Sequence, residues 1–408
     1  MNIPQSQPQP TSSPSSSTTS DPMQSWWESI SKARTRISLL ISLLPPSLSP
    51  SISLLADTDR PARSLLLSHS SYSSITLSLS NPSSGSGSDP LCHWLYDTFL
   101  SADPDLRLVV LSYIPVLSGI YLSRIHSNSN NSLSGFEAVL LSIYASETKA
   151  RNGKAVVVNL PDLNLPSLYH TPRNVSNSSN AKLNGNAGTN TNVNGGYKLG
   201  GKSGVLCPPL EPQTAVKSTK RAFIVGVVLD CYYKQISQMP VWSKLDFCRI
   251  AADWAGQDCE CRTEFDEEVG NVFGEEVRVE EIDEVGEGIG DLRITENGEN
   301  GDCDVGVKGA RIPLPWELLQ PVLRILGHCL MGPMNSNEVK DAASVAVRSL
   351  YARASHELVP QALLATRSLI QLDKRARESA QLAAVNSASS NANTPSKAKK
   401  PEILLVSK

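Results

Sequence analysis

Aromatic residues are scarce in this 408-residue chain. Only 5% of its residues are aromatic, although 40% are hydrophobic and the formal net charge is −3. The hydrophobic content is enough for one large domain or two small ones, whereas the low aromatic content predicts that part of the chain stays unstructured. Residues 1–20 are rich in Pro, Ser and Thr and have neither a basic start nor an apolar core. They therefore do not resemble a secretory signal.

Long apolar runs are also missing. The best candidate for a membrane span, residues 106–122, is about one residue shorter than the usual length and contains Arg107 and Pro115. We predict a buried core helix there. Any association with a membrane is then expected to be peripheral or to be supplied by a partner protein.

Cysteine occurs eight times but in no recognisable metal-binding pattern. Only Cys259 and Cys261 lie close together, and one C-x-C pair without a second pair or a nearby His is a poor zinc pattern. Free thiols in a reducing cytosol are the simplest expectation.

Motifs for phosphate binding, acyl transfer and zinc-dependent hydrolysis are absent, because the sequence contains no G-x-x-x-x-G-K-[ST], no G-x-S-x-G and no H-E-x-x-H. Cys92 with His93, and His328 with Cys329, could suggest thiol–imidazole pairs. Sequence neighbours face different sides of a helix, so ordinary packing is expected for both pairs. His170 lies in a loop-like stretch and is predicted to be a surface or loop histidine. We predict no catalytic, cofactor-binding or metal-binding residue.

Charge is distributed unevenly along the chain. Residues 258–304 hold 18 Asp and Glu against three Arg, a net charge of −15, and the remainder holds 34 basic against 22 acidic residues. The acidic stretch is Gly-rich and lacks the residue order of a calcium loop, so a disordered insert is predicted over residues 258–308.

Basic residues near the C-terminus are too dispersed, and too far from aromatic residues, to predict binding of nucleic acid or of an anionic membrane. A solvated helix face and a polar tail are expected instead. The residues concerned are Lys374, Arg375, Arg377, Lys397, Lys399 and Lys400.

Three Asp-Pro pairs are typical of helix starts, since Asp caps the first N–H groups and Pro fits the first turn. They are Asp21–Pro22, Asp89–Pro90 and Asp103–Pro104, and the helix that follows the third is predicted to break or kink at Pro115. Trp94 and Phe136 are expected in the core.

Further helices are predicted by apolar residues at helical spacing. Ser134 with Glu137, and Asn335 with Glu338, are predicted to be capping pairs. The predicted ranges are 134–150, 219–239, 242–256, 315–330, 336–357 and 360–382.

One extended stretch, residues 155–160, is β-branched and follows the turn signal Asn152–Gly153. It predicts a small strand or arm. The Asn-, Gly- and Ser-rich residues that follow are predicted to be a flexible linker over 173–210.

The predicted fold is all-α, an irregular stack of about ten antiparallel helices with one short extended arm and disordered insertions. Its helical domain is predicted over residues 21–385, with disordered tails over 1–20 and 386–408.

The order of several short motifs resembles the hyccin family. They are Asp89-Pro90-Leu91-Cys92-His93-Trp94-Leu95-Tyr96, Ile114-Pro115-Val116-Leu117 with Tyr121-Leu122, Phe136-Glu137-Ala138-Val139-Leu140-Leu141 with Tyr144, and the family's signature loop, Pro161-Asp162-Leu163 with Pro166-Ser167-Leu168-Tyr169-His170. The resemblance covers residues 21–375 in collinear order. The acidic insert and the start at Trp26–Trp27 suggest a plant-like member.

The resemblance implies a non-catalytic subunit without a cofactor. Hyccin relatives pair with a tetratricopeptide-repeat scaffold protein, and the pair stabilises a phosphatidylinositol 4-kinase of the type III alpha class. A palmitoylated membrane-anchoring protein brings this assembly to the plasma membrane, where phosphatidylinositol 4-phosphate is made. The chain is accordingly expected in the cytoplasm and, through its partners, at the cytosolic side of the plasma membrane.

Two other interpretations stay open. The first is a helical adaptor in vesicle traffic or nuclear scaffolding, which would have the same helices but no dependence on the kinase. The second is a helical enzyme, such as a small-molecule transferase, which would need a polar pocket around His93 or His170.

Wide apolar helix faces predict a chain that is marginally soluble alone and stable as a heterodimer, because part of these faces would be left for a partner. The faces comprise Ile37, Leu40, Ile41, Leu44, Val109, Leu111, Ile114, Leu117, Leu363, Leu364, Leu369 and Ile370.

Overall fold

The computed structural model describes residues 22–44, 46, 49–127, 132–160, 202–256 and 312–391. These ranges contain thirteen α-helices, one 3₁₀ helix and a two-stranded sheet, which confirms the predicted all-α fold. The chain divides into two compact units. Residues 1–144 and 215–408 form the helical unit, and residues 145–214 form the ribbon unit.

The N-terminal half of the chain contributes eight helices. They are α1 (Pro22–Leu43), α2 (Ser49–Ala56), α3 (Pro61–Leu66), α4 (His69–Ser80), α5 (Pro90–Leu100), α6 (Pro104–Ser112), α7 (Ile114–His126) and α8 (Ser134–Ala150). The last turn of α8 already belongs to the ribbon unit.

The C-terminal half contributes the other helices of the helical unit. They are α9 (Ser218–Lys234), the 3₁₀ helix η1 (Ile236–Gln238), α10 (Val241–Ala255), α12 (Trp316–Met331), α13 (Asn337–Glu357) and α14 (Pro360–Asn391). Helix α14 runs past residue 385, so the predicted end of the helical domain was six residues short.

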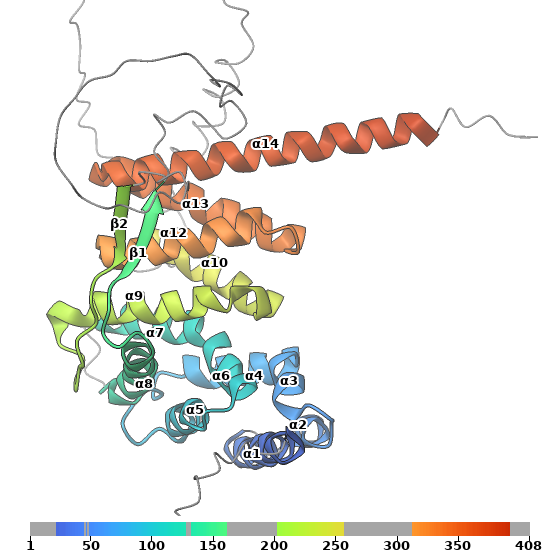
Figure 1. Ribbon diagram of the computed structural model, residues 1–408, viewed down its shortest axis with the longest axis vertical. Helices are drawn as coiled ribbons and strands as arrows, with labels where there is room; N and C mark the ends of the chain where they lie inside the picture. The colour runs from blue at the N-terminus through green and yellow to red at the C-terminus, as the bar shows by residue number, and fades with distance from the viewer. Residues whose placement is uncertain are drawn as a thin grey trace, which may run out of the picture. The chain divides into compact units, whose positions relative to one another are not determined.

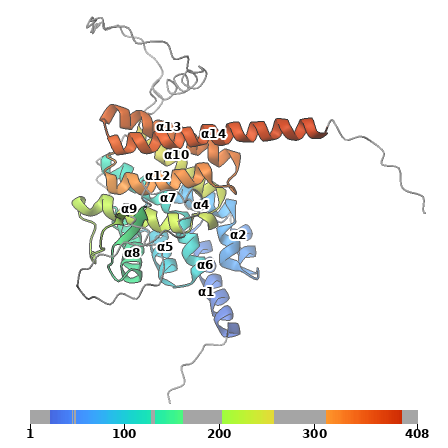
Figure 2. The same cartoon turned by 45° about the horizontal axis from the view of Figure 1, so that its top comes forward.

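Within the helical unit the helices are stacked in layers (Figure 1). Helix α1 contacts α2, α3 and α5; α6 and α7 contact α9; α9 and α10 contact α12; and α13 contacts α14. Helix α14 lies beside α13 and then extends past it (Figures 1 and 2). Each layer therefore buries its apolar residues against the next, as the predicted stack requires.

Helix starts follow the sequence in part. The carboxylates of Asp89 and Asp103 accept the backbone N–H groups of Leu91 and Leu106, each at 2.9 Å, which confirms both predicted caps. The two predicted capping pairs were wrong. The Glu137 N–H donates to the Leu133 carbonyl at 3.0 Å instead of to Ser134, and α13 is capped by Ser336 instead of Asn335.

The predicted break near Pro115 is present. Helices α6 and α7 meet at Tyr113 with a bend of 42°, and Pro115 lies in the first turn of α7. Most of their side chains, from Leu106 to Leu122, are buried in the helical unit, so the predicted core helix is confirmed as a bent pair.

No single helix within the described ranges is long and apolar enough to cross a membrane; only α6 and α7 taken together pass that test of length and composition.

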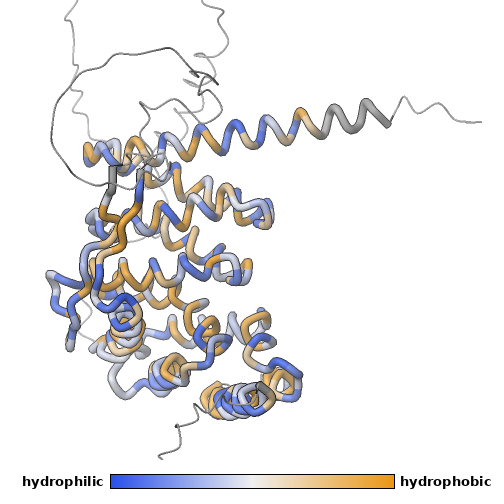
Figure 3. The backbone as a smooth tube through the Cα atoms, viewed as in Figure 1, coloured by the Kyte–Doolittle hydropathy of each residue, from blue (hydrophilic) through white to orange (hydrophobic). Residues whose placement is uncertain are grey.

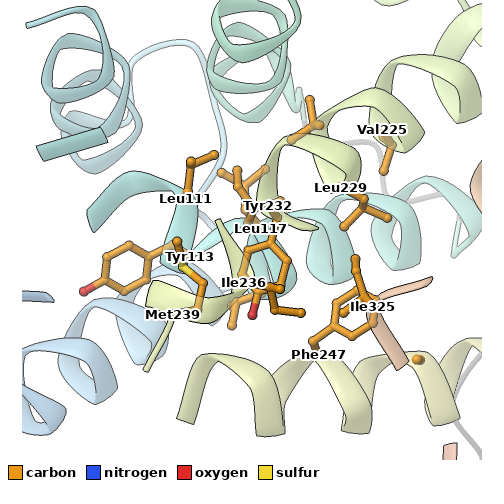
Figure 4. Packing of buried hydrophobic residues seen from close by; sticks show 14 of the residues in the cluster. Leu111, Tyr113, Leu117, Val225, Leu229, Tyr232, Ile236, Met239, Phe247 and Ile325 are labelled. Atoms are coloured by element: carbon orange, nitrogen blue, oxygen red, sulfur yellow. The ribbon is translucent and has the colours of Figure 1, made fainter. Parts of the chain in front are cut away.

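The main core joins α6, α7, α9, α10 and α12 (Figure 4). Tyr232 of α9 stacks on Phe247 of α10 with ring centroids 6.0 Å apart. Trp94 and Phe136 are 3% and 0% exposed, as predicted for core residues. Hydrophobic residues recur in every layer of the helical unit (Figure 3). Of the twelve apolar residues expected to leave a patch for a partner, only Leu364 is exposed.

Three helices were missed by the sequence analysis, namely α2, α3 and α4. In α4 the hydroxyls of Ser74 and Ser78 donate to carbonyls four residues earlier, at 2.8 and 2.9 Å. Such bonds compete with helical structure and make a Ser-rich segment look unlike a helix. Tertiary packing stabilises α4 as a helix, because Tyr72, Ile75 and Leu79 are buried on one face.

The ribbon unit contains β1 (Val156–Leu160) and β2 (Lys202–Cys207), which pair antiparallel with a bulge between Val156 and Val157. Strand β1 is the predicted short arm. Strand β2 corrects the predicted linker 173–210, because its C-terminal residues 202–207 form a strand. Pairing with β1 supplies the backbone hydrogen bonds of this strand, and the pairing could not be predicted from its polar sequence.

Candidate functional site

Cys92 and His93 point in different directions from α5. The Cys92 side chain is buried and its thiol donates to the Asp89 carboxylate at 3.4 Å, whereas His93 is exposed and bonds the Gly87 carbonyl at 2.7 Å. Burial, with the nearby Asp89 carboxylate, raises the pKa of the Cys92 thiol. A thiol held in its protonated form is a poor nucleophile, so this pair lacks the arrangement of a catalytic dyad.

His328 and Cys329 on α12 are likewise separated. Cys329 is fully buried and hydrogen-bonds the thiol of Cys248 on α10, which raises the pKa of Cys248 together with burial. His328 is half-buried with its ring edge toward Tyr233, and burial lowers its pKa. Both residues act in the packing of α9, α10 and α12.

Buried charged groups in the helical unit bind backbone and amide groups. Lys244 of α10 donates to the Asn335 side-chain oxygen at 2.9 Å, and burial lowers its pKa. Asn335 in turn donates to the carbonyls of His328 and Cys329 at the end of α12. Arg353 of α13 donates to the Trp254 carbonyl at 2.5 Å. These contacts fix α10 against α12 and α13, and we call this region the α10 junction.

Another buried contact joins three helices. The Tyr121 hydroxyl donates to Glu137 at 2.9 Å and accepts from Arg221 at 3.1 Å. Glu137 was predicted to cap α8 and instead binds Tyr121, so this acidic residue also has a structural partner.

Basic residues of α14 lie beside acidic ones, as expected for a solvated face. Arg377 bonds Asp341 at 2.8 Å and Asp373 at 2.9 Å. Lys397, Lys399 and Lys400 lie outside the described residues, as do Asp162, His170, Cys259, Cys261 and the insert 258–308. Among the residues that the structure describes, no three His, Cys, Asp or Glu side chains are placed to hold a metal ion.

A hollow of about 450 Å³ lies beside the first half of α1, and we call it the α1 hollow. The first turns of α1 line it on one side, and residues 59–62 and 102–105 line the other. Trp26 forms part of its wall and is 45% exposed. The Asp103 carboxylate accepts a short hydrogen bond from Ser29 as well as the N–H of Leu106.

A second hollow, of about 470 Å³, lies between α4, α7 and α10. Val116, Ile120 and Trp254 give it apolar walls, and Arg249 with Asp246 forms an ion pair at its rim, at 3.3 Å. The positive and negative side chains that line it are balanced, so its charge does not indicate what kind of ligand it would bind.

Neither hollow could be predicted from the sequence. Trp26 follows the predicted helix start at Asp21–Pro22, but its exposure of 45% depends on tertiary structure. Asp59 and Arg60 lie in a short connection without a motif, so no signal in the sequence points to them.

A comparison with protein families matches the one described as Hyccin over residues 56–404. This span begins at the end of α2 and includes α3 to α14. It covers well over half of the 408 residues.

Proposed function

Because the chain belongs to the hyccin family, we propose that it is the adaptor subunit that stabilises a phosphatidylinositol 4-kinase of the type III alpha class. The family consists of non-catalytic adaptors with a general role in that kinase complex. The match over residues 56–404 is the observation that carries the proposal.

The side chains support an interaction role. The polar groups most deeply placed, in the α10 junction and at Tyr121, hydrogen-bond carbonyls, amides and side chains of neighbouring helices. They stabilise the stack, and the exposed helix surfaces are left for partners.

The partners proposed are a tetratricopeptide-repeat scaffold protein, the kinase and a palmitoylated membrane-anchoring protein. The chain would then act in the cytoplasm and at the cytosolic side of the plasma membrane. Its membrane association would come through these partners and not through a lipid anchor of its own.

The test is co-expression of the full chain with the tetratricopeptide-repeat scaffold and the kinase of the same organism. We expect the three proteins to copurify and the kinase to phosphorylate phosphatidylinositol vesicles for longer than when the chain is omitted. Binding a folded partner stabilises by mass action, so the chain should also melt at a higher temperature with the scaffold.

Failure to copurify, with an unchanged melting temperature, would favour the vesicle-traffic adaptor. A His93→Ala chain that folds and binds the scaffold but abolishes lipid phosphorylation would contradict the non-catalytic role. His93 is exposed, so this substitution should leave the fold intact.

A further inference from the structure

A group of basic side chains lies at the start of α9. Lys217, Lys220 and Arg221 are close together in the sequence, and spacings of three and four bring side chains together on a helix. His126, at the end of α7, lies near them, because burial and the charge of Arg221 lower its pKa. Lys217 and Lys220 are exposed, and neither forms an ion pair with a residue in the described ranges. We call these four residues the α9 basic patch.

The α9 basic patch has little negative charge beside it. The first turn of α9 contains no acidic residue, and no side chain caps it. The N–H groups at the start of a helix carry a partial positive charge, which adds to the charges of Lys217 and Lys220. Arg221 donates to the Tyr121 hydroxyl at 3.1 Å, and the Glu137 carboxylate accepts from the same hydroxyl at 2.9 Å. One carboxylate does not balance the patch, so an acidic ligand would be favoured there.

The acidic residues 258–304 are joined to a helix that runs beside this patch. Helix α12 packs along α9 in the same direction, because Glu317 lies against Gly226 and, further along both helices, Arg324 pairs with Asp230. A Cβ at Gly226 would be 2.3 Å from the Glu317 carbonyl oxygen. The chain therefore enters α12 beside the first half of α9.

The distances along the chain allow the acidic residues to reach the patch. Lys220 is six residues from Gly226, which is about 9 Å along a helix. Asp304 is twelve residues before Trp316, and twelve extended residues span at most about 40 Å. The connection is therefore long enough to bring the carboxylates near Asp304 to Lys217 and Lys220.

We propose that the α9 basic patch binds the acidic residues 258–304 of the same chain. Their carboxylates would accept from Lys217, Lys220 and the N–H groups of the first turn of α9. Single exposed ion pairs are weak, but a short connection holds the acidic residues at an effective concentration of about a millimolar, so several weak pairs are enough. This contact lies within one chain and does not depend on the proposed adaptor function.

Charge favours this occupant over the alternatives. Residues 258–304 have a net charge of −15, and an external acidic protein or an anionic membrane would have to displace them from the patch. The basic residues of α14 fit the acidic residues less well, because Arg377 already pairs with Asp341 and Asp373.

The first test is cross-linking of the full chain with a carbodiimide, which joins Lys amines to carboxyl groups in direct contact, followed by mass spectrometry. We expect Lys217 and Lys220 to be linked to residues 258–304 at least about fivefold more often than the exposed Lys149 and Lys154. These links should become rare in about 0.5 M NaCl, because salt screens exposed charges.

The second test is amide hydrogen exchange of residues 218–224 in a full chain that carries Lys217→Glu and Lys220→Glu. Acidic residues at the start of a helix stabilise it, so without the proposed contact these substitutions should slow exchange. With the contact, they repel residues 258–304, and exchange should become at least about threefold faster. A chain with Lys149→Glu and Lys154→Glu has the same change in charge and should exchange within about twofold of the parent chain. Melting temperatures show whether the variants fold.

Slower exchange in the Lys217→Glu, Lys220→Glu chain would overturn the proposal, as would equally frequent cross-links of Lys149 and Lys154. So would binding of the parent chain to phosphatidylserine vesicles that these two substitutions abolish, because the patch would then be open to a membrane. The proposed function is tested separately. Copurification with the kinase in the absence of these cross-links refutes only this inference, and the reverse result refutes only the proposed function.

Discussion

The α10 junction and the α1 hollow differ in whether their side chains have partners within the stack. In the α10 junction, Lys244 binds Asn335, and Arg353 binds the Trp254 carbonyl. In the α1 hollow, Trp26 is half-exposed and Asp59 has no ion pair with a described residue. Unpaired polar groups are costly when buried and tolerable when solvated. The comparison indicates that the polar groups of the α10 junction are partnered inside the stack, whereas Trp26 and Asp59 face solvent.

Alkaline pH should destabilise the core around the α10 junction with the largest effect. Burial raises the pKa of Tyr113 and Tyr232 above the ordinary value of 10.0. Hydrogen bonding to Cys329 and burial raise that of Cys248 above 9.0. These groups stabilise the fold fully below their ordinary pKa values, and the stabilisation is lost as pH rises above them. Lys244 has the opposite effect. Burial lowers its pKa, so the folded state becomes more stable as pH rises toward the ordinary value of 10.5.

The unfolding free energy should therefore fall as pH rises above about 9, by about 1.4 kcal/mol per pH unit for each group whose ordinary pKa has been passed. Urea unfolding between about pH 7 and 11 measures it. A Tyr113→Phe chain should show a shallower dependence, and an unfolding free energy that does not change over this range would contradict the prediction.

Phe247→Ala should have the next largest effect. Phe247 is fully buried and stacks on Tyr232, so its removal leaves a cavity in the α10 junction and should cost about 3–5 kcal/mol. Equilibrium unfolding in urea gives the value. The control is Phe247→Leu, which keeps most of the volume and should cost about 1–2 kcal/mol.

Asn335→Ala should cost about 2–3 kcal/mol, because it removes the acceptor of Lys244 and uncaps the end of α12. Thermal and urea unfolding both report it. Asn337 lies two residues later and is exposed, so Asn337→Ala should change stability by less than about 0.5 kcal/mol. Equal effects of the two substitutions would show that the buried contact contributes nothing.

Asp103→Ala tests the link between α6 and the α1 hollow. It removes the cap of α6 and the acceptor of Ser29, and should cost about 1–2 kcal/mol in urea unfolding. Asp103→Asn keeps an equally good cap and should cost less. If Asn were as damaging as Ala, the carboxylate charge would matter more than the hydrogen bonds.

Trp27→Ala should have the smallest effect, within about 0.5 kcal/mol of the parent chain, because its side chain is 56% exposed. The melting temperature measures it. A loss as large as that of Asp103→Ala would mean that the N-terminal end of α1 belongs to the stable region, and the comparison would fail.

Helices with regular apolar spacing could be predicted from the sequence, and those held by packing alone could not. The caps at Asp89 and Asp103 and the break at Pro115 follow from local chemistry. Helices α2 to α4 do not, because α2 and α3 are only eight and six residues long and because Ser hydroxyls obscure the pattern of α4. Strand β2 depends on a partner strand more than forty residues earlier. Asn335 looked like a cap, but its side chain is drawn into a contact with Lys244 from another helix.

Of the residues of the α1 hollow, those of α1 and of the start of α6 were predicted as parts of helices, whereas residues 59–62 were not. Trp26 and Ile30 have the same spacing and similar chemistry, yet one is half-exposed and the other buried. Their difference arises from tertiary packing, which the spacing does not reveal. Local sequence therefore gave the helix and its face but could not tell which part of that face stays open.

The long separation between α10 and its partners has a consequence during protein synthesis. Lys244 and Asn335 are 91 residues apart, and Arg353 is 99 residues from Trp254. At about 5–20 residues per second, a ribosome needs about 5–20 s to add that length. The apolar face of α10 has no α13 to pack against during this interval, and exposed apolar surface of this kind makes a partly folded chain prone to aggregation.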